Sequence, residues 1–376
     1  MNRSITSTIV DHFQGVDDPR VERNKRHQLR DILTIAICAV LCGAETWVDV
    51  AEFGQARVNW FRTILDLPNG IPSHDTFGRV FARLNPAQLQ SGFLSWVKGT
   101  FSLADAQVIA IDGKALRGSQ EKVHGITPLQ MVSAWAAENR LVLGQLQVDD
   151  KSNEITAIPT LLSLLDLTGC TVTIDAMGCQ RKIAEQIITQ GGEYVLVLKQ
   201  NHSHLYQDVA ATFADVRTGT DITVSYHETV ELGHGRHETR RYWITDHRDG
   251  IRQRDAWQGL QSVGMVEATR RIDGKQTTHR RYFLCSIAPD VEPFRHAVRT
   301  HWQIENSLHW VLDIAFGEDA SRVRVDNGPQ NLAVLRHMAL NLLRTEPSRG
   351  SIQTKRLRAG WNHAYLMKVL AAGAAS

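Results

Sequence analysis

The sequence predicts an α/β protein with a helix-covered mixed β-sheet, a helical N-terminal region and a mostly β insertion. Short apolar runs alternate with segments of helical periodicity between residues 107 and 198, which is typical of such a sheet. The 376 residues, 43% of them hydrophobic, suffice for two or three domains. We expect a helical domain over 1–100, a core domain over 101–345 with the insertion at about 201–290, and a basic C-terminal tail over 346–376.

The N-terminal region shows helical periodicity only. Apolar residues recur at helical spacing over Leu29–Leu41 and again over Phe77–Leu84. The second segment follows the turn signals of Pro68 to Pro72, and Ser73 or Asp75 would cap its first turn. Basic residues precede the first helix, so this region is a candidate for contacts with an acidic partner. These residues are Arg20, Arg23, Lys25, Arg26 and Arg30.

The core region contains three strands followed by an alternation of helix and strand. The strands are expected at Gln107–Ile111, Leu129–Ala137, Leu141–Val148, Thr171–Ile174 and Tyr194–Leu198, and the helices at Ile155–Leu165 and Arg181–Thr189. The first three strands would form a meander, and helices would separate the last two, which predicts a mixed sheet. This order matches the ribonuclease H-like fold, in which the first strand is central and neighbours the fourth.

The insertion and the end of the chain have different patterns. β-rich stretches occur at Thr223–Val230, Glu238–Ile244, Ser262–Arg270 and Arg280–Ser286, and helical periodicity returns at Phe294–Ala315 and Pro329–Leu343. After Glu346 there is no acidic residue, whereas five Lys and Arg residues follow. Two alternatives stay open for this tail, a solvated surface segment or a phosphate-contacting one.

Charge and cysteine usage restrict the class of protein only weakly. The net charge of +2 neither requires nor excludes a nucleic-acid partner, because binding depends on where the charge lies. The five cysteines are odd in number and fit no zinc motif, which favours a reducing cytoplasmic location. We expect no membrane association, since there is no secretory signal and the apolar stretch Ile32–Gly43 is too short to span a bilayer.

Two aspartates follow apolar strands directly. Asp112 ends the run IAID and Asp175 ends VTID, 175 − 112 = 63 residues later. If these strands are neighbours, both carboxylates emerge at one edge of the sheet, where their repulsion favours a cation between them. Hard divalent cations such as Mg²⁺ prefer oxygen ligands of this kind. Either aspartate alone would more often be a turn former or a helix cap.

A third acidic candidate lies within a histidine-rich helical segment. His301, Glu305 and His309 recur every four residues, so that they share one face of a helix. Such a stripe is either a transition-metal site or simply a polar helix face, and it does not contain the HExxH zinc motif.

Five sequence blocks together resemble the DDE transposases of bacterial insertion sequences. Among these transposases, the resemblance is greatest to the H-repeat-associated group. The blocks are IAIDGKALRGS, VTIDAMGCQ, LVLKQNH, GHGRHETRR and HWQIENSLHWVLDIAFGEDASR. The resemblance implies a ribonuclease H-like core, a β insertion before the glutamate and a catalytic, metal-binding triad of Asp112, Asp175 and Glu305. The second gap, 305 − 175 = 130 residues, is long enough for the insertion. The implied activity is cleavage and strand transfer of DNA at insertion-sequence ends.

The resemblance also implies cofactors and partners. Two Mg²⁺ ions about 3.5–4 Å apart, with Mn²⁺ as a substitute, would clamp the attacking and leaving oxygens. DNA would be the partner, and a homodimer would act in the DNA complex. The helical domain over 1–100, with its basic start, would bind the element ends. The Tyr-Arg-Lys pattern of related enzymes is absent, because Val298, His301 and Leu312 occupy its positions. The candidates for contacts with DNA are Lys114, Arg117, Lys199, Arg236, His301 and His309.

Two other functions remain open from the sequence. One is a metallohydrolase that uses His301, His309 and an aspartate with Zn²⁺ or Mn²⁺. The other is a domesticated or inactive relative that only binds DNA. Metal preference distinguishes the first alternative, and failure of the purified protein to nick DNA with Mg²⁺ distinguishes the second.

Overall fold

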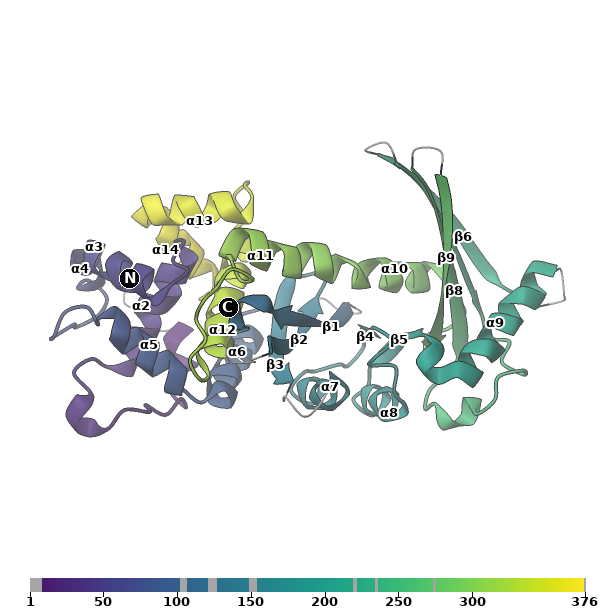
Figure 1. Cartoon of the computed structure of the whole chain (residues 1–376), viewed down its shortest axis with the longest axis horizontal. Helices are drawn as coiled ribbons and strands as arrows, with labels where there is room; N and C mark the ends of the chain where they lie inside the picture. The colour runs from purple at the N-terminus through teal and green to yellow at the C-terminus, as the bar shows by residue number, and fades with distance from the viewer. Residues whose placement is uncertain are drawn as a thin grey trace.

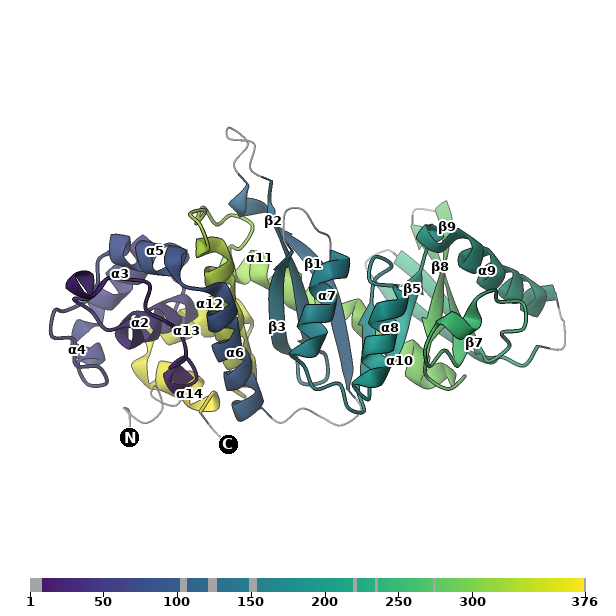
Figure 2. The ribbon, with the colours of Figure 1, turned by 90° about the horizontal axis from the view of Figure 1, so that it is seen from below.

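The computed structural model of the chain describes residues 9–101, 107–120, 127–148, 154–218, 222–233, 236–272 and 275–374. The molecule is elongated, with the N-terminal helices at one end, a sheet with its covering helices in the middle and the inserted strands at the other end (Figure 1; Figure 2). The C-terminal helices lie beside the N-terminal ones, so that the two ends of the sequence share one lobe (Figure 1).

The secondary structure follows the predicted order. The helices are α2 Leu29–Leu41, α3 Trp47–Ala56, α4 Val58–Phe61, α5 His74–Arg83, α6 Pro86–Thr100, α7 Glu154–Ser163, α8 Arg181–Thr189, α9 Ser203–Thr218, α10 Val291–His301, α11 Trp310–Phe316, α12 Gly328–Thr345, α13 Ile352–Trp361 and α14 His363–Ala372. The strands are β1 Val108–Leu116, β2 Leu129–Ala136, β3 Leu141–Val148, β4 Thr171–Ile174, β5 Glu193–Leu198, β6 Ser225–Gly233, β7 Arg236–Thr245, β8 Ser262–Ile272 and β9 Lys275–Cys285.

The nine strands form one mixed sheet in the order β3-β2-β1-β4-β5-β9-β8-β7-β6. β1 pairs antiparallel with β2 and parallel with β4, and β4 pairs parallel with β5. The predicted α/β class and ribonuclease H-like strand order are therefore confirmed. The ladder also differs from the prediction, because β1 continues beyond Ile111 and stays paired with β2 as far as Leu116. Asp112 consequently lies within a strand, at the point where the parallel partner β4 ends.

The insertion extends the core sheet and does not form a separate one. Its last strand, β9, pairs antiparallel with β5 from Val195 to Leu198, and the other three strands follow outward in a meander. The helix α9 opens the insertion, before the first β stretch that the sequence predicted, and the four strands β6 to β9 follow it. Through this pairing, the register of β9 decides which of its side chains face the core helices.

The N-terminal lobe is built around two buried helices. Every residue of α2 from Asp31 to Leu41 is buried, as expected for a helix that is apolar on all sides. On α12, Asn341 fixes the helix to the sheet, since its side chain accepts from the Val142 N–H and donates to the Val142 carbonyl, both at 2.9 Å. Within the described ranges, no helix is long and apolar enough to cross a membrane.

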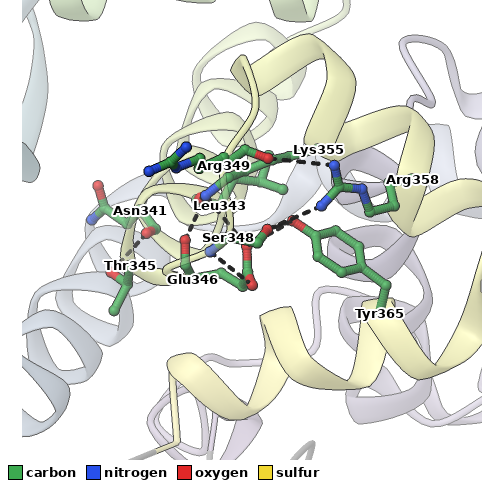
Figure 3. Close-up of polar contacts among 9 residues, drawn as sticks. All are labelled: Asn341, Leu343, Thr345, Glu346, Ser348, Arg349, Lys355, Arg358 and Tyr365. Atoms are coloured by element: carbon green, nitrogen blue, oxygen red, sulfur yellow. Dashed lines mark hydrogen bonds and ion pairs between the residues drawn. The ribbon is translucent and has the colours of Figure 1, made fainter.

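The C-terminal segment is not a tail. The expected solvated or phosphate-contacting stretch folds into α13 and α14, which pack against α11 and α12. Lys355 and Arg356 are 5% and 2% exposed, and both donate to backbone carbonyls. Figure 3 shows the polar network around Lys355, in which the carboxylate of Glu346 accepts from Ser348 Oγ at 2.5 Å and Tyr365 Oη at 2.7 Å. Arg356 lies outside this network and donates to the carbonyl of Val40. These two basic side chains are therefore satisfied inside the fold.

The Glu346 network predicts a pH-dependent contribution to stability. Burial alone would raise the pKa of Glu346, but hydrogen bonds from Ser348 and Tyr365 lower this pKa to about 2. Because the folded-state pKa lies below the unfolded value, the contribution is complete above about pH 4.5 and is lost as the pH falls toward 2. Glu346→Gln should lower the free energy of unfolding by about 2 kcal/mol at pH 7.

Denaturant unfolding at pH 7 and pH 3 measures this effect. The gap between Glu346→Gln and the unmodified protein should narrow at pH 3, whereas the exposed Arg349→Ala control should show no gap at either pH. An equal loss at both pH values would contradict the role of the ionised carboxylate.

Candidate active site

The sheet topology brings the two predicted aspartates together. Ile111 on β1 pairs with Ile174 on β4 in parallel register, so that Asp112 and Asp175 both follow the last pair of this parallel ladder. Asp175 turns out of the sheet immediately, where its Oδ1 accepts from the N–H of Met177 at 3.0 Å. The two carboxylates therefore lie side by side, as the sequence predicted.

Glu305 reaches the same edge from the helical segment after the insertion. α10 packs across β1, β4 and β5 and delivers a π-helical turn, Glu305–His309, before α11 begins. A π turn carries one extra residue and is often found at functional sites. Ile304 and Leu308 are buried beneath this turn, while Glu305 stays accessible. The expected regular α-helix is thus widened at the position of the glutamate.

The three acidic residues line one cavity of about 330 Å³. Burial raises the pKa of Asp112 to about 7, and the negative charges of Asp175 and Glu305 contribute to this rise. The carboxylate side chain of Asp112 is 20% exposed. The surroundings of Asp112 therefore disfavour its ionised form.

A fourth carboxylate, which the sequence reasoning missed, adjoins this group. Glu154 is the first residue of α7, and a Cβ on Gly113 would lie only 2.1 Å from its Oε1. A larger residue after Asp112 would therefore force the Glu154 carboxylate away from the strand. Burial raises the pKa of Glu154, and the charge of Asp175 raises it further. The sequence predicts a helix over Ile155–Leu165 but does not mark Glu154 as a site residue. Many helices have an acidic residue in the first turn, so Glu154 alone gives no sign of a site.

Both histidines of the predicted stripe contact the acidic strands. His309 Nδ1 lies 3.6 Å from Asp112 Oδ2, and His301 Nδ1 lies 3.0 Å from the hydroxyl of Thr173 on β4. Burial lowers the pKa of each histidine to about 4, so both are neutral at pH 7. This arrangement supports a positioning role for His301, because its bond connects α10 to the strand that carries Asp175.

The structure contradicts the expected DNA contact of Lys114. Its side chain is 11% exposed, and its ammonium group pairs with Asp313 and with Glu318, the latter at 2.8 Å. Because β1 continues past Asp112, Lys114 points from the strand into a buried ionic network that also includes Arg336, 3.7 Å from Glu318. Lys114 therefore ties the strand of Asp112 to the segment after Glu305.

The other predicted cations are placed differently. Lys199 is exposed and lines the acidic cavity. Arg117 lies just after β1 with its side chain 80% exposed, 3.7 Å from Asp319. Arg236 begins β7, but its side chain lies outside the described residues. In the N-terminal region, Arg20 is 10% exposed and pairs with Asp18 at 2.7 Å, so it is not free to contact a partner.

Arg281 is a further cavity residue that the sequence did not reveal. It comes from β9 of the insertion, and its guanidinium lies 4.0 Å from the ring centroid of Trp302 in a cation–π contact. Burial lowers the pKa of Arg281, and the nearby Arg270 and Arg240 lower it further. The insertion thereby contributes a cation to the wall of the acidic cavity.

The donor set suits a hard divalent cation. Three carboxylates share one cavity, and the surroundings of Asp112 raise its pKa. A cation bound beside these carboxylates would lower this pKa and favour the ionised form. Among the residues described, no three His, Cys, Asp or Glu side chains already lie close enough to hold an ion. The site would form after small rotations of these side chains. Glu305 is exposed, so its side chain has room to rotate.

Comparison with known proteins identifies the family of this chain. The family described as "Transposase DDE domain" matches residues 103–342, and "DDE_Tnp_1-associated" matches residues 10–97. The chain belongs to the DDE transposase family. Two relatives from Escherichia coli are "Putative transposase YncI", 37% identical over 97% of this chain and 94% of the relative, and "H repeat-associated putative transposase YhhI", 36% identical over 96% and 97%.

One solved structure is also similar to this transposase-family chain. It is the "Cryo-EM structure of piggyBac transposase synaptic complex with hairpin DNA", with a TM-score of 0.43 and 10% identity. The match covers 98% of this chain and 77% of that chain.

The buried position of Lys114 predicts a loss of stability on its replacement. Lys114→Met should lower the free energy of unfolding by about 3 kcal/mol, because Glu318 stays buried with one partner fewer. Arg117→Met, further along the chain and exposed, is the matched control and should change it by less than about 0.5 kcal/mol. Equal stability of both variants in denaturant unfolding would make Lys114 a candidate DNA contact again.

Proposed function

We propose that this chain catalyses metal-dependent cleavage of DNA strands at insertion-sequence ends and their transfer to target DNA. One observation carries the proposal: Asp112, Asp175 and Glu305 come from two strands and a π-helical turn to line one cavity. Membership in the DDE transposase family supports the same assignment.

The acidic residues would hold Mg²⁺, or Mn²⁺ in its place. When bound, such ions supply charge neutralisation at the phosphate and activation of an oxygen nucleophile. Asp112, Asp175 and Glu305 would provide the oxygen ligands, and Glu154 would add negative charge next to Asp112. His309, neutral at pH 7, would keep the Asp112 side chain in place.

The reaction requires two displacements at phosphorus. In the first, water attacks and the P–O3′ bond breaks, which leaves a 3′-hydroxyl on one strand. In the second, that hydroxyl attacks a phosphate of the target, a new P–O3′ bond forms, and the target's own P–O3′ bond breaks, so that a 3′-hydroxyl of the target strand leaves. Lys199 and Arg281 on the cavity wall would contact flanking phosphates. A homodimer on paired ends stays a prediction.

The arrangement of the histidines does not favour a His/Asp metallohydrolase. His301 Nδ1 is hydrogen-bonded to the hydroxyl of Thr173 and is therefore not free to bind a metal ion. Burial is the main reason that the pKa values of both histidines are low. The DNA-binding-only alternative is separated by the activity test that follows.

Substitution of the triad tests the proposal. Asp112→Asn, Asp175→Asn and Glu305→Gln should each reduce Mg²⁺-dependent cleavage by at least about a thousandfold, since each removes a charged ligand. DNA affinity should remain within about twofold, because these residues carry the wrong charge to bind phosphate. Asp255→Asn, with a side chain that is 98% exposed, is the control and should cleave normally.

Three outcomes of this assay contradict parts of the proposal. Near-normal cleavage by one variant would remove that residue from the triad. Activity in all three variants would refute the assignment of the cavity. An unmodified protein that binds element ends but never cleaves them with Mg²⁺ or Mn²⁺ would establish the DNA-binding-only alternative.

A further inference from the structure

A second hollow, of about 500 Å³, lies apart from the acidic cavity. It is formed by the start of α3, by α5 and by the segment 322–328 that precedes and begins α12. It shares no lining residue with the acidic cavity. Both views show α5 beside the loop that leads into α12 (Figure 1; Figure 2). We call this hollow the arginine groove after four of its lining residues, Arg79, Arg83, Arg322 and Arg324.

The two walls of the arginine groove are fixed to one another. The N–H of Asn327 donates to the carbonyl of Ala82 at 3.1 Å, and the fully buried Asn331 donates to the carbonyl of Phe81 at 2.8 Å. Trp47 forms the floor, where it stacks on Phe81 with ring centroids 4.6 Å apart. Side chains 250 positions apart in sequence thus build one rigid surface.

The charge of the groove is unbalanced. Arg79 and Arg83 lie one turn apart on the same face of α5 and are exposed. Arg322, also exposed, faces them from the other wall, and these three arginines form no ion pair in the part of the chain that the structure describes. The acidic lining residues are two, Asp75 and Asp326. An anionic ligand would therefore find several uncommitted guanidinium groups here.

The groove is connected to the acidic cavity through β1. Arg324 Nε donates to the carbonyl of Gly118 at 2.9 Å, and Gly118 follows Asp112 by 118 − 112 = 6 residues. Six residues span at most about 20 Å. This span is shorter than one turn of B-form DNA, which is about 34 Å long.

We propose that the arginine groove binds the phosphate backbone of duplex DNA about one helical turn or less from the cleaved bond. The ligand is duplex DNA because the free charges are guanidiniums, which form paired hydrogen bonds to phosphate, and because they lie within reach of the acidic cavity. This inference rests on the proposed function, and it adds a positioning site that involves both the N-terminal lobe and the segment after Glu305.

Binding of duplex DNA to the full chain tests the proposal. The probe is a random-sequence duplex of about 30 base pairs, in EDTA so that no strand is cut, and affinity is measured across a salt series. Arg79→Ala, Arg83→Ala and Arg322→Ala should each weaken binding by about tenfold. The slope of log affinity against log salt should become shallower by about one for each phosphate that the variant no longer neutralises.

A matched control and a second readout separate the outcomes. Arg62→Ala removes an exposed arginine of the same lobe outside the groove and should leave affinity and slope unchanged. If the unmodified protein binds and cleaves DNA but the groove variants behave like Arg62→Ala, the groove is refuted and the proposed function stands. If the unmodified protein does not bind duplex DNA, both fail. Weakened self-association with unchanged DNA affinity would assign the groove to a second copy of the chain and overturn the proposal.

Discussion

Repulsion between carboxylates at one edge of the sheet is the constraint on which the site depends. Parallel pairing of β1 with β4 ends at Ile111 and Ile174 and forces Asp112 and Asp175 into proximity. The buried pairing of Lys114 with Glu318 joins β1 to the segment after Glu305. A divalent cation bound between these carboxylates, as we propose, would relieve the repulsion and couple metal binding to the geometry of the site.

Periodicity predicted the strand order and both aspartates, because short apolar runs report directly on buried strands. The apolar run ends at Ile111, but β1 stays paired with β2 as far as Leu116. The sequence pattern therefore did not reveal where this strand ends. This extension is the reason that Lys114, a plausible phosphate contact in the sequence, is buried in the structure. Glu305 was predicted to join the two aspartates only from the resemblance of its sequence block to the transposase family. That resemblance did not indicate the π-helical turn in which Glu305 lies.

Contacts between distant segments explain what the sequence left out. Glu154 adjoins Asp112 only because α7 folds back over Gly113, and Arg281 reaches the cavity only through the register of β9 on β5. Counting basic residues was misleading at the C-terminus, since Lys355 is buried within the Glu346 network. Charge in a sequence indicates a partner only after the internal partners of each side chain are known.

Direct measurement of metal binding tests whether the acidic edge of the sheet is a divalent-cation site. Mn²⁺ titration of the full chain without DNA, followed by electron paramagnetic resonance at pH 7.5 or above, counts bound ions independently of catalysis. We predict binding that Asp112→Asn reduces by at least about tenfold and that Mg²⁺ competes away, with Asp255→Asn unchanged. Equal Mn²⁺ binding by the unmodified protein and Asp112→Asn would contradict the assignment of this edge as a metal site.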